Sequence, residues 1–200
     1  VFADSLPDDF GNQLIDIVMA QKNIPPEDIT SLDRLMYIGN RGMGAIEYRP
    51  SNEMETTNDL QALDLNMLNE LAELTNTNQL ELAEKLNNAD THAQALHFIK
   101  IGSSAGGARS KALIATNRSN GTIKDGTVDH GVDYDYWLLK FDSKDNGDRD
   151  QKDPPGMTRV EYIYSIIAQE CDIDMPRTHF IEEAELFHFK IERFDRIKHQ

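Results

Sequence analysis

The chain has 200 residues, of which 39% are hydrophobic and 28% charged, a composition that excludes a disordered tail and suffices for one domain or two small lobes. Acidic residues outnumber basic ones by 35 to 20, which gives a formal net charge of -15. This charge repels the phosphates of nucleic acids and of anionic lipids, so direct nucleic-acid or membrane binding by the chain is not expected.

The first 50 residues predict two helices followed by a loop. Four apolar residues recur at helical spacing before Pro25 and Pro26 end the first helix: Leu14, Ile15, Val18 and Met19. Thr30 or Ser31 can cap the second helix, glycines break it after residue 38, and residues 45–48 could form a short strand. The stretch GNRGMG at 39–44 superficially resembles a phosphate loop. Because no strand precedes it and no helix follows it, a structural turn is favoured.

Residues 59–87 predict a pair of acidic helices. Their leucines recur at helical spacing and form one apolar face, and the polar residues 75–78 separate the two helices. A solvated helical hairpin with one buried face accounts for this stretch, and no cofactor site is indicated.

From residue 96 onward the pattern changes. Residues 96–101 could be extended or helical and lead into a segment rich in glycine and serine at 102–111. An apolar run at 112–115 follows this segment and is compatible with a strand.

The next stretch predicts two connections around one compact strand. Residues 116–133 are polar and rich in glycine, so they are most simply a turn between strands. Residues 136–141 predict a strand in which Lys140 is set among apolar neighbours. The polar residues 142–155 predict a loop.

The last quarter predicts one helix and two strands. Val160, Ile163, Tyr164 and Ile167 lie at helical spacing, and strands are expected near 177–182 and 186–193. Cys171 is the only cysteine, which excludes an intrachain disulfide and fits a reducing cytoplasm. No apolar run approaches the roughly 20 residues that a membrane helix needs.

The order of these elements is that of the small lobe of a protein kinase. A Gly-rich segment is followed by a strand with Lys140, a helix with Glu161, and two strands that end in the sequence IERFDR at 191–196. Such a lobe places a glycine loop over the nucleotide phosphates, a lysine that pairs with them, a helical glutamate and a hinge in this order.

Each position suits its expected chemistry. Glycines let backbone N–H groups approach phosphate oxygens closely, and apolar neighbours fix the direction of the Lys140 ammonium. Glu161 can hold that ammonium when nucleotide is absent. On its own, Lys140 would more simply be a strand lysine whose head group reaches solvent, and only its ordered partners favour the phosphate role. Glu161 could equally be a solvated helix residue.

Six sequence stretches resemble the HipA family of toxin–antitoxin kinases over essentially the whole chain. The kinase part carries SAGGARSKA at 104–112, WLLKF at 137–141 and ERFDR at 192–196. The part ahead of it carries LPDDFG at 6–11, and LDRL at 32–35 with GMGA at 42–45.

The resemblance implies roles for individual residues. The ATP-binding Gly-rich segment would comprise Gly106, Gly107, Ala108, Arg109, Ser110 and Lys111. Lys140 would pair with the nucleotide phosphates, and the hinge that meets adenine through backbone groups would comprise Glu192, Arg193 and Phe194. Ser104 matches a serine whose autophosphorylation ejects the loop and stops the kinase, and the adjacent Ser103 is the alternative. A phosphate of about −1.5 to −2 charges there would disfavour ATP binding.

The expected fold is α+β. Residues 1–95 would form a mainly helical segment typical of the N-terminal part of HipA, and residues 96–200 a kinase-like small lobe with an antiparallel sheet and one helix. Because the chain begins with Val1 and stops at Gln200, just after the hinge, we expect a fragment of a longer kinase.

The catalytic and metal-binding residues would lie beyond Gln200, so this chain contributes no catalytic residue and no metal ligand, and it is expected to be inactive alone. Residues 88–92 imitate a catalytic loop but precede the Gly-rich segment, and they are better explained as a helix end. The parent protein would use ATP and Mg²⁺, phosphorylate a protein substrate on serine or threonine, and bind a HipB-like DNA-binding antitoxin. The alternatives are a non-catalytic interaction module, or a degenerate kinase, that binds an antitoxin or another protein. A lipid-kinase-like protein is a third possibility, which the acidic charge disfavours.

Overall fold

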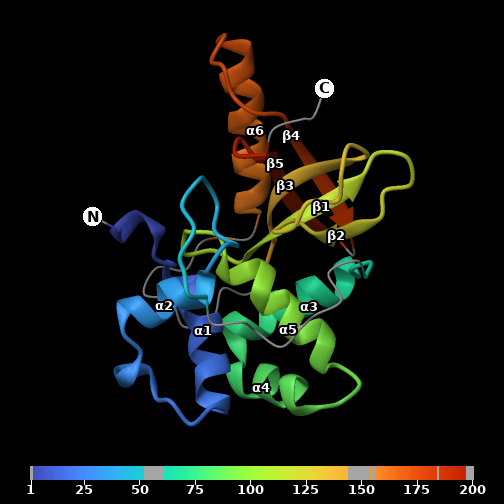
Figure 1. The fold of residues 1–200 in the computed structure, drawn as a ribbon. Helices are drawn as coiled ribbons and strands as arrows, with labels where there is room; N and C mark the ends of the chain where they lie inside the picture. Colours follow the sequence, from blue (N-terminus) through green and yellow to red (C-terminus); the bar gives the residue numbers. More distant parts are fainter. Residues whose placement is uncertain (1, 52–60, 144–153, 155, 184, 197–200) are drawn as a thin grey trace.

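The computed structural model describes residues 2–51, 61–143, 154, 156–183 and 185–196. Within these ranges it is an α+β structure of six α-helices, two short 3₁₀ helices and a five-stranded antiparallel sheet, which confirms the predicted fold class. Figure 1 shows helices α1 to α5 gathered on one side of the sheet and α6 on the other.

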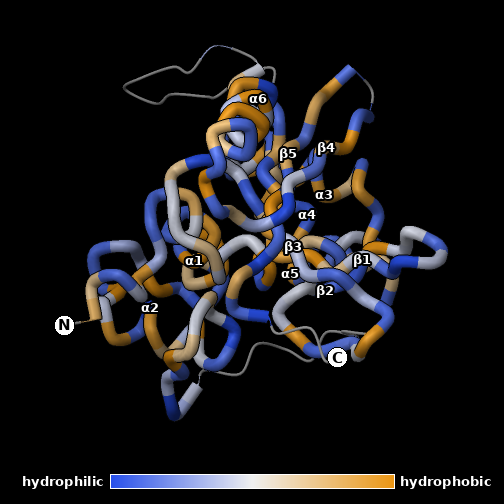
Figure 2. The backbone as a smooth tube through the Cα atoms, turned by 90° about the horizontal axis from the view of Figure 1, so that it is seen from above, coloured by the Kyte–Doolittle hydropathy of each residue, from blue (hydrophilic) through white to orange (hydrophobic). Residues whose placement is uncertain are grey.

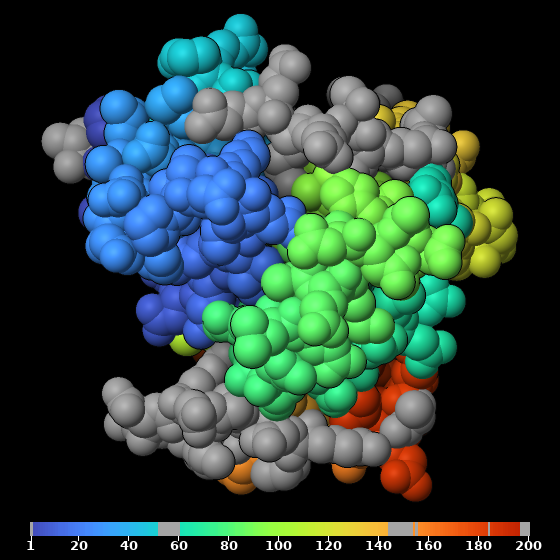
Figure 3. All heavy atoms as spheres, turned by 90° about the horizontal axis from the view of Figure 1, so that it is seen from below, coloured from blue at the N-terminus to red at the C-terminus, as the bar shows by residue number. Residues whose placement is uncertain are grey.

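The N-terminal half of the chain is helical. It contains two short 3₁₀ helices and five α-helices: η1 (Ala3–Ser5), α1 (Asp9–Gln21), η2 (Pro26–Asp28), α2 (Ser31–Ile38), α3 (Leu65–Thr77), α4 (Gln79–Asn87) and α5 (His92–Ser103). Thr30, one of the two candidates from the sequence, caps α2 through a reciprocal pair of hydrogen bonds with Asp33. Seen from below, α1 and α2 lie beside α3 to α5 and cover this face of the molecule (Figure 3).

The C-terminal half forms the sheet in the order β2-β1-β3-β5-β4. Its elements are β1 (Lys111–Asn117), β2 (Ile123–Asp125), β3 (Tyr134–Lys140), α6 (Met157–Glu170), β4 (Thr178–Glu183) and β5 (Leu186–Glu192). Strand β3 is central: Lys140 is opposite Lys111 of β1 on one side and Phe189 of β5 on the other.

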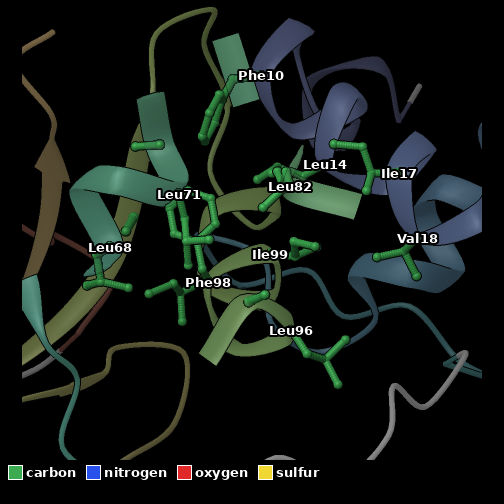
Figure 4. Packing of buried hydrophobic residues seen from close by; sticks show 14 of the residues in the cluster. Phe10, Leu14, Ile17, Val18, Leu68, Leu71, Leu82, Leu96, Phe98 and Ile99 are labelled. Carbon is green, nitrogen blue, oxygen red and sulfur yellow. The ribbon is translucent and has the colours of Figure 1, made fainter. Parts of the chain in front are cut away.

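The two faces of the sheet pack against different helices. Trp137 and Leu139 of β3 belong to the main hydrophobic core with α1, α3, α4 and α5, and Figure 4 shows Phe10, Leu71 and Phe98 in that core. Alternate residues of a strand project to opposite faces, so Leu138 and Lys140 project to the face that carries α6.

Helix α6 packs on the sheet through an aromatic cluster. The Tyr162 ring lies 5.0 Å from that of Phe180 and 5.9 Å from that of Phe187. The four apolar residues that predicted the helix, including Val160 and Tyr164, point elsewhere and are 39% to 68% exposed. Hydrophobic segments are visible along α6 from above (Figure 2). The spacing therefore identified the helix correctly, and a different side of that helix packs on the sheet.

Three local predictions need correction or completion. Residues 45–48 do not form a strand: Gly44 has a φ of +95°, and the segment continues as a loop. Residues 96–101 are helical, within α5. The predicted turn 116–133 contains strand β2, which was missed because it has only three residues. The predicted loop 142–155 lies mostly outside the described residues.

The division of the chain at residue 95 into a helical segment and a kinase-like lobe stays a prediction. Helix α5 runs from His92 to Ser103 and spans that point. It is buried from Ala95 to its end, between the other helices and β1, so the helical layer and the sheet share one core.

Candidate functional site

The Lys140 ammonium is held by a carboxylate of α6. Lys140 is the last residue of β3, and its Nζ atom donates to Oε2 of Glu161 in the first turns of α6. The same ammonium lies 5.8 Å from the centre of the Phe189 ring. The structure thus brings together the lysine and the glutamate that the sequence analysis selected.

Glu161 also binds the Gly-rich segment. Its second oxygen, Oε1, accepts a hydrogen bond of 2.8 Å from the Arg109 guanidinium. The three side chains are each less than a third exposed, so the ion pairs are partly shielded from water. One carboxylate therefore joins the Gly-rich segment, β3 and α6.

The Gly-rich segment links the end of α5 to the start of β1, rather than joining two strands. Gly106, Gly107, Ala108 and Arg109 are exposed or half-buried and form the outer part of this link. Ser110 is buried, and its hydroxyl accepts a hydrogen bond of 2.6 Å from Asn76 of α3. The segment thus divides into an accessible centre and an end that is anchored in the helical layer.

Both backbone groups of Gly107 bind charged side chains of the chain itself. Its N–H donates to Oδ2 of Asp8, and its carbonyl accepts from the Lys111 ammonium. Gly107 has a φ of +106°, and a Cβ atom there would lie 2.7 Å from Nζ of Lys111. The backbone conformation therefore favours glycine, whereas the ammonium at the end of the flexible Lys111 side chain could shift to make room for a Cβ atom.

Lys111 is almost fully enclosed. Only 2% of its surface is exposed, and its ammonium lies 5.8 Å from the centre of the Phe10 ring of α1. A cation in such a position needs hydrogen-bond acceptors, which Gly107 supplies.

The two serines ahead of the segment are turned inward. The Ser104 hydroxyl donates to the carbonyl of Lys100 at 2.9 Å, and that of Ser103 donates to the same oxygen at 3.4 Å. Both serines are buried at the end of α5. A kinase could reach either hydroxyl only after this part of the chain had moved outward.

The residues that were predicted as the hinge end the sheet. The N–H of Glu192 donates to Arg177 and that of Arg193 donates to Tyr136, at 2.8 and 3.0 Å. Because both N–H groups are already bonded within the sheet, a nucleotide base at this segment would have to use a backbone N–H donor beyond Arg193. The Phe194 side chain is 75% exposed.

A polar pocket of about 230 Å³ lies at the end of β5, beside Glu192 and Arg193. Its charged groups are largely paired with each other: the Arg193 guanidinium binds both carboxylate oxygens of Asp195, at 2.9 and 2.6 Å. Burial would raise the pKa of the Asp195 carboxyl, but the Arg193 guanidinium and the Gly44 N–H hold it below its usual value. The pocket is lined by Arg118, Asp129, Gly131, Val132, Tyr134, Asp135, Tyr136, Glu192, Arg193, Asp195 and Arg196.

A buried charge cluster, which the sequence analysis did not find, ties α5 to β2. The Asp125 carboxylate is fully buried and binds His97 at 3.1 Å, Lys100 at 3.0 Å and the Thr127 hydroxyl at 2.6 Å. Burial alone would raise the pKa of Asp125, but the bonds from His97 and Thr127 and the Lys100 charge hold it well below its usual value. No sequence motif links Asp125 to His97 and Lys100, so the sequence gave no signal for this cluster.

The donor set is cationic and suits an anion, such as a phosphate group, better than a metal ion. Arg109, Lys111 and Lys140 bring three cations to one end of the sheet, next to backbone that lies partly at the surface. Within the described ranges, no three His, Cys, Asp or Glu side chains are grouped so that they could hold a metal ion.

Two models of known protein families match separate parts of the chain. Residues 1–49 match the HipA N-terminal domain, and residues 103–200 match the HipA-like C-terminal domain. No curated protein matches the chain. Among the described residues, no helix is long and apolar enough to cross a membrane. The second match covers the Gly-rich segment, Lys140, Glu161 and the segment that was predicted as the hinge, and the first covers Asp8, so the chain belongs to the HipA family.

Proposed function

We propose that the chain is the ATP-binding, N-terminal part of a HipA-like protein serine/threonine kinase toxin. The observation that carries this proposal is the ion pair between Lys140 and Glu161, with Arg109 of the Gly-rich segment on the second oxygen of the same carboxylate. A strand lysine that is held by a helical glutamate beside a glycine loop is the arrangement that protein kinases use to orient nucleotide phosphates.

The α6-facing side of β3 would carry the nucleotide. Tyr136, Leu138 and Lys140 alternate along the strand, so they project from this same face. Tyr136 lines the pocket at the hinge, and Lys140 lies four residues farther along, or about 13 Å at ~3.3 Å per residue. The half-buried Leu138 lies between them. We place the base near Glu192 and Arg193 and the phosphates near Lys140.

The chain's own residues would bind and orient the phosphates. Lys140 would exchange part of its contact with Glu161 for a contact with a phosphate oxygen. Arg109, which binds the other oxygen of the same carboxylate, would exchange its contact in the same way. The N–H groups of Gly106, Gly107 and Ala108, with Lys111, would complete the phosphate site. Bound ATP would supply the phosphoryl group, and Mg²⁺ would neutralise charge on it.

No residue of the chain is assigned the part of catalytic base or of magnesium ligand. We therefore expect no phosphate transfer by residues 1–200 alone and transfer by the full-length gene product. The comparison is made with [γ-³²P]ATP and a protein substrate, and transfer by residues 1–200 alone would contradict this assignment.

The burial of Ser104 supports a regulatory role for its phosphorylation. A phosphate of about −1.5 to −2 charges cannot stay where the hydroxyl now contacts the Lys100 carbonyl in the core. The modified residue would have to leave, and it would take the adjacent Gly-rich segment with it. We propose that this movement removes the phosphate site and stops the kinase.

We extend the proposal to partners. The full-length protein would bind a HipB-like DNA-binding antitoxin and a protein substrate in the cytoplasm. With a net charge of -15, the chain itself is poorly suited to hold DNA, so the antitoxin would make the DNA contacts.

The deciding experiment replaces Lys140 by alanine in the full-length gene product. Lys124→Ala, on strand β2 of the same sheet, serves as the control. We expect Lys140→Ala to lose ATP affinity and phosphorylation of the protein substrate, and Lys124→Ala to keep both. Phosphorylation at the wild-type rate by Lys140→Ala would refute the proposal.

A further inference from the structure

Asp8 occupies the N-cap position of α1 but does not cap the helix with its side chain. Its carbonyl accepts the N–H of Asn12 at 2.8 Å, and its backbone is extended, as expected at an N-cap. Its carboxylate makes no hydrogen bond to the first turn of α1. The side chain is directed instead to a segment 99 residues farther along the chain.

The Asp8 carboxylate lies against the centre of the Gly-rich segment. Its Oδ2 atom accepts the N–H of Gly107. The same oxygen would be 3.2 Å from a Cβ atom at Gly106. Two of the glycines that we assign to the phosphates thus face a carboxylate oxygen of the chain itself, and Asp8 is exposed at the surface.

The surrounding charges make this position suitable for an anion. The carbonyl of Gly107 holds the ammonium of Lys111, and two residues beyond Gly107 the Arg109 guanidinium binds Glu161. Carboxylate and phosphate oxygens use the same N–H and cationic donors. A carboxylate on the Gly107 N–H therefore stands where a phosphate oxygen would bind.

We propose that Asp8 is an internal anion that occupies the phosphate position of the Gly-rich segment and is displaced when nucleotide binds, an inference that rests on the proposed function. The Gly107 N–H cannot donate to the Asp8 carboxylate and to a phosphate oxygen at the same time. The two negative groups would also repel each other if both lay beside this N–H. Nucleotide binding therefore requires the Asp8 side chain to turn toward solvent. Asp8 would thus act as a positioning residue that lowers nucleotide affinity and holds the empty segment in place.

The competing explanation is that Asp8 is a purely structural support for the segment. The two explanations predict different changes in nucleotide affinity when the charge of Asp8 is removed. If Asp8 competes with phosphate, a neutral side chain at this position tightens nucleotide binding. If it only supports the segment, the same change weakens binding or leaves it unaltered.

The test measures the Kd for Mg-ATP by calorimetry in the full-length gene product. Asp8→Asn removes the charge but keeps a good N-cap residue, and Asp8→Ser repeats the test with a shorter neutral N-cap residue. Asp9→Asn, the exposed next residue, is the matched control. We expect the two Asp8 variants to lower the Kd by about two- to five-fold, as exposed charge interactions allow. Asp9→Asn should leave the Kd unchanged.

Salt provides a second readout that a structural support would not change. The gain in affinity of Asp8→Asn over wild type should shrink at about 0.5 M salt, where charges are screened within a few ångströms. An unchanged or higher Kd in both Asp8 variants would overturn the inference alone, provided that the wild type binds Mg-ATP and Lys140→Ala does not. A wild type that fails to bind Mg-ATP would overturn the proposed function and this inference together.

Discussion

Lys111 and Lys140 are directly opposite each other in the antiparallel pair of β1 and β3. Like charges at directly opposite positions destabilise a sheet unless each has its own partner. Here the partners lie in different directions: Lys140 binds Glu161 of α6, and Lys111 binds the carbonyl of Gly107. The two ammonium groups are thereby held at the same end of the paired strands, each with its own partner.

Loss of the Glu161 charge should destabilise the folded chain. Glu161→Gln would leave Arg109 and Lys140 near each other without their shared carboxylate, in a partly shielded position. We expect the free energy of unfolding to fall by about 1–2 kcal/mol, between the values for exposed and buried ion pairs. Urea denaturation measures it. Glu170→Gln, at the exposed end of the same helix, should change it by less than about 0.5 kcal/mol.

Equal losses in the Glu161 and Glu170 variants would show that the shared carboxylate contributes nothing specific. A double-mutant cycle that combines Glu161→Gln with Lys140→Met separates the contribution of the Lys140 contact from that of the Arg109 contact.

The Asp125 cluster should make the fold sensitive to acid. The pKa of Asp125 is lower in the folded chain than in the unfolded chain, so its stabilisation is complete above the unfolded value of about 3.9 and is lost as the pH falls below it. Asp125→Asn leaves Lys100 buried without its counter-charge and should cost about 3 kcal/mol at neutral pH. Urea denaturation at several pH values measures both effects.

Asp133→Asn is the control for Asp125, because Asp133 is exposed in the loop that precedes β3. It should leave the unfolding free energy nearly unchanged. If Asp125→Asn showed the same loss between pH 5 and pH 3 as wild type, the acid sensitivity would have another origin.

The sequence predicted the order of the elements because each is encoded locally. The spacing of Leu14, Ile15 and Val18 specifies α1, and Thr30 with Asp33 specifies the start of α2. The partnership of Lys140 with Glu161 could be expected because a strand, a loop and a helix follow in the order of a kinase lobe.

Contacts between distant segments could not be predicted in this way. Asp8 and Gly107 are 99 residues apart, and nothing in the sequence LPDDFG indicates that its first aspartate reaches a glycine instead of capping its own helix. In α6, helical spacing was satisfied by the exposed Val160 and Tyr164, whereas the sheet is contacted by Tyr162. The spacing of apolar residues predicts that a helix forms, but the surface of the sheet on which the helix packs decides which side of it is buried.

His188 should add a second pH dependence at higher pH. Its Nδ1 atom accepts the N–H of Asp142 at 3.0 Å, and burial lowers the pKa of the ring, so the folded chain holds it neutral. The unfolded chain binds the proton more readily, so stability is full above about pH 6.5 and falls as the pH drops below it, by at most ~1.4 kcal/mol per pH unit. His188→Asn keeps an acceptor and should remove this dependence, whereas His179→Asn, at an exposed position of β4, should keep it. Identical profiles for all three proteins between pH 7 and pH 5 would contradict the assignment.

The Tyr37 hydroxyl is a polar group buried beneath the surface of the helical layer. Among the described residues it finds no hydrogen-bond partner, and burial raises the pKa of Tyr37 above its ordinary value. Tyr37→Phe keeps the ring over which the Arg41 guanidinium lies at 5.1 Å and removes only the desolvated oxygen. We therefore expect the free energy of unfolding to stay constant or rise by up to about 1 kcal/mol.

Tyr136→Phe is the matched control for Tyr37→Phe, because the same atom is removed from a hydroxyl that has partners. The Tyr136 hydroxyl accepts the N–H of His130 at 2.6 Å and donates to Asp129 at 3.0 Å. Its removal should lower the unfolding free energy by about 1 kcal/mol or more, since the His130 N–H loses its acceptor. Thermal and urea denaturation of both variants give the comparison. A larger loss in Tyr37→Phe than in Tyr136→Phe would mean that the Tyr37 hydroxyl has a partner in the folded protein, such as an ordered water molecule.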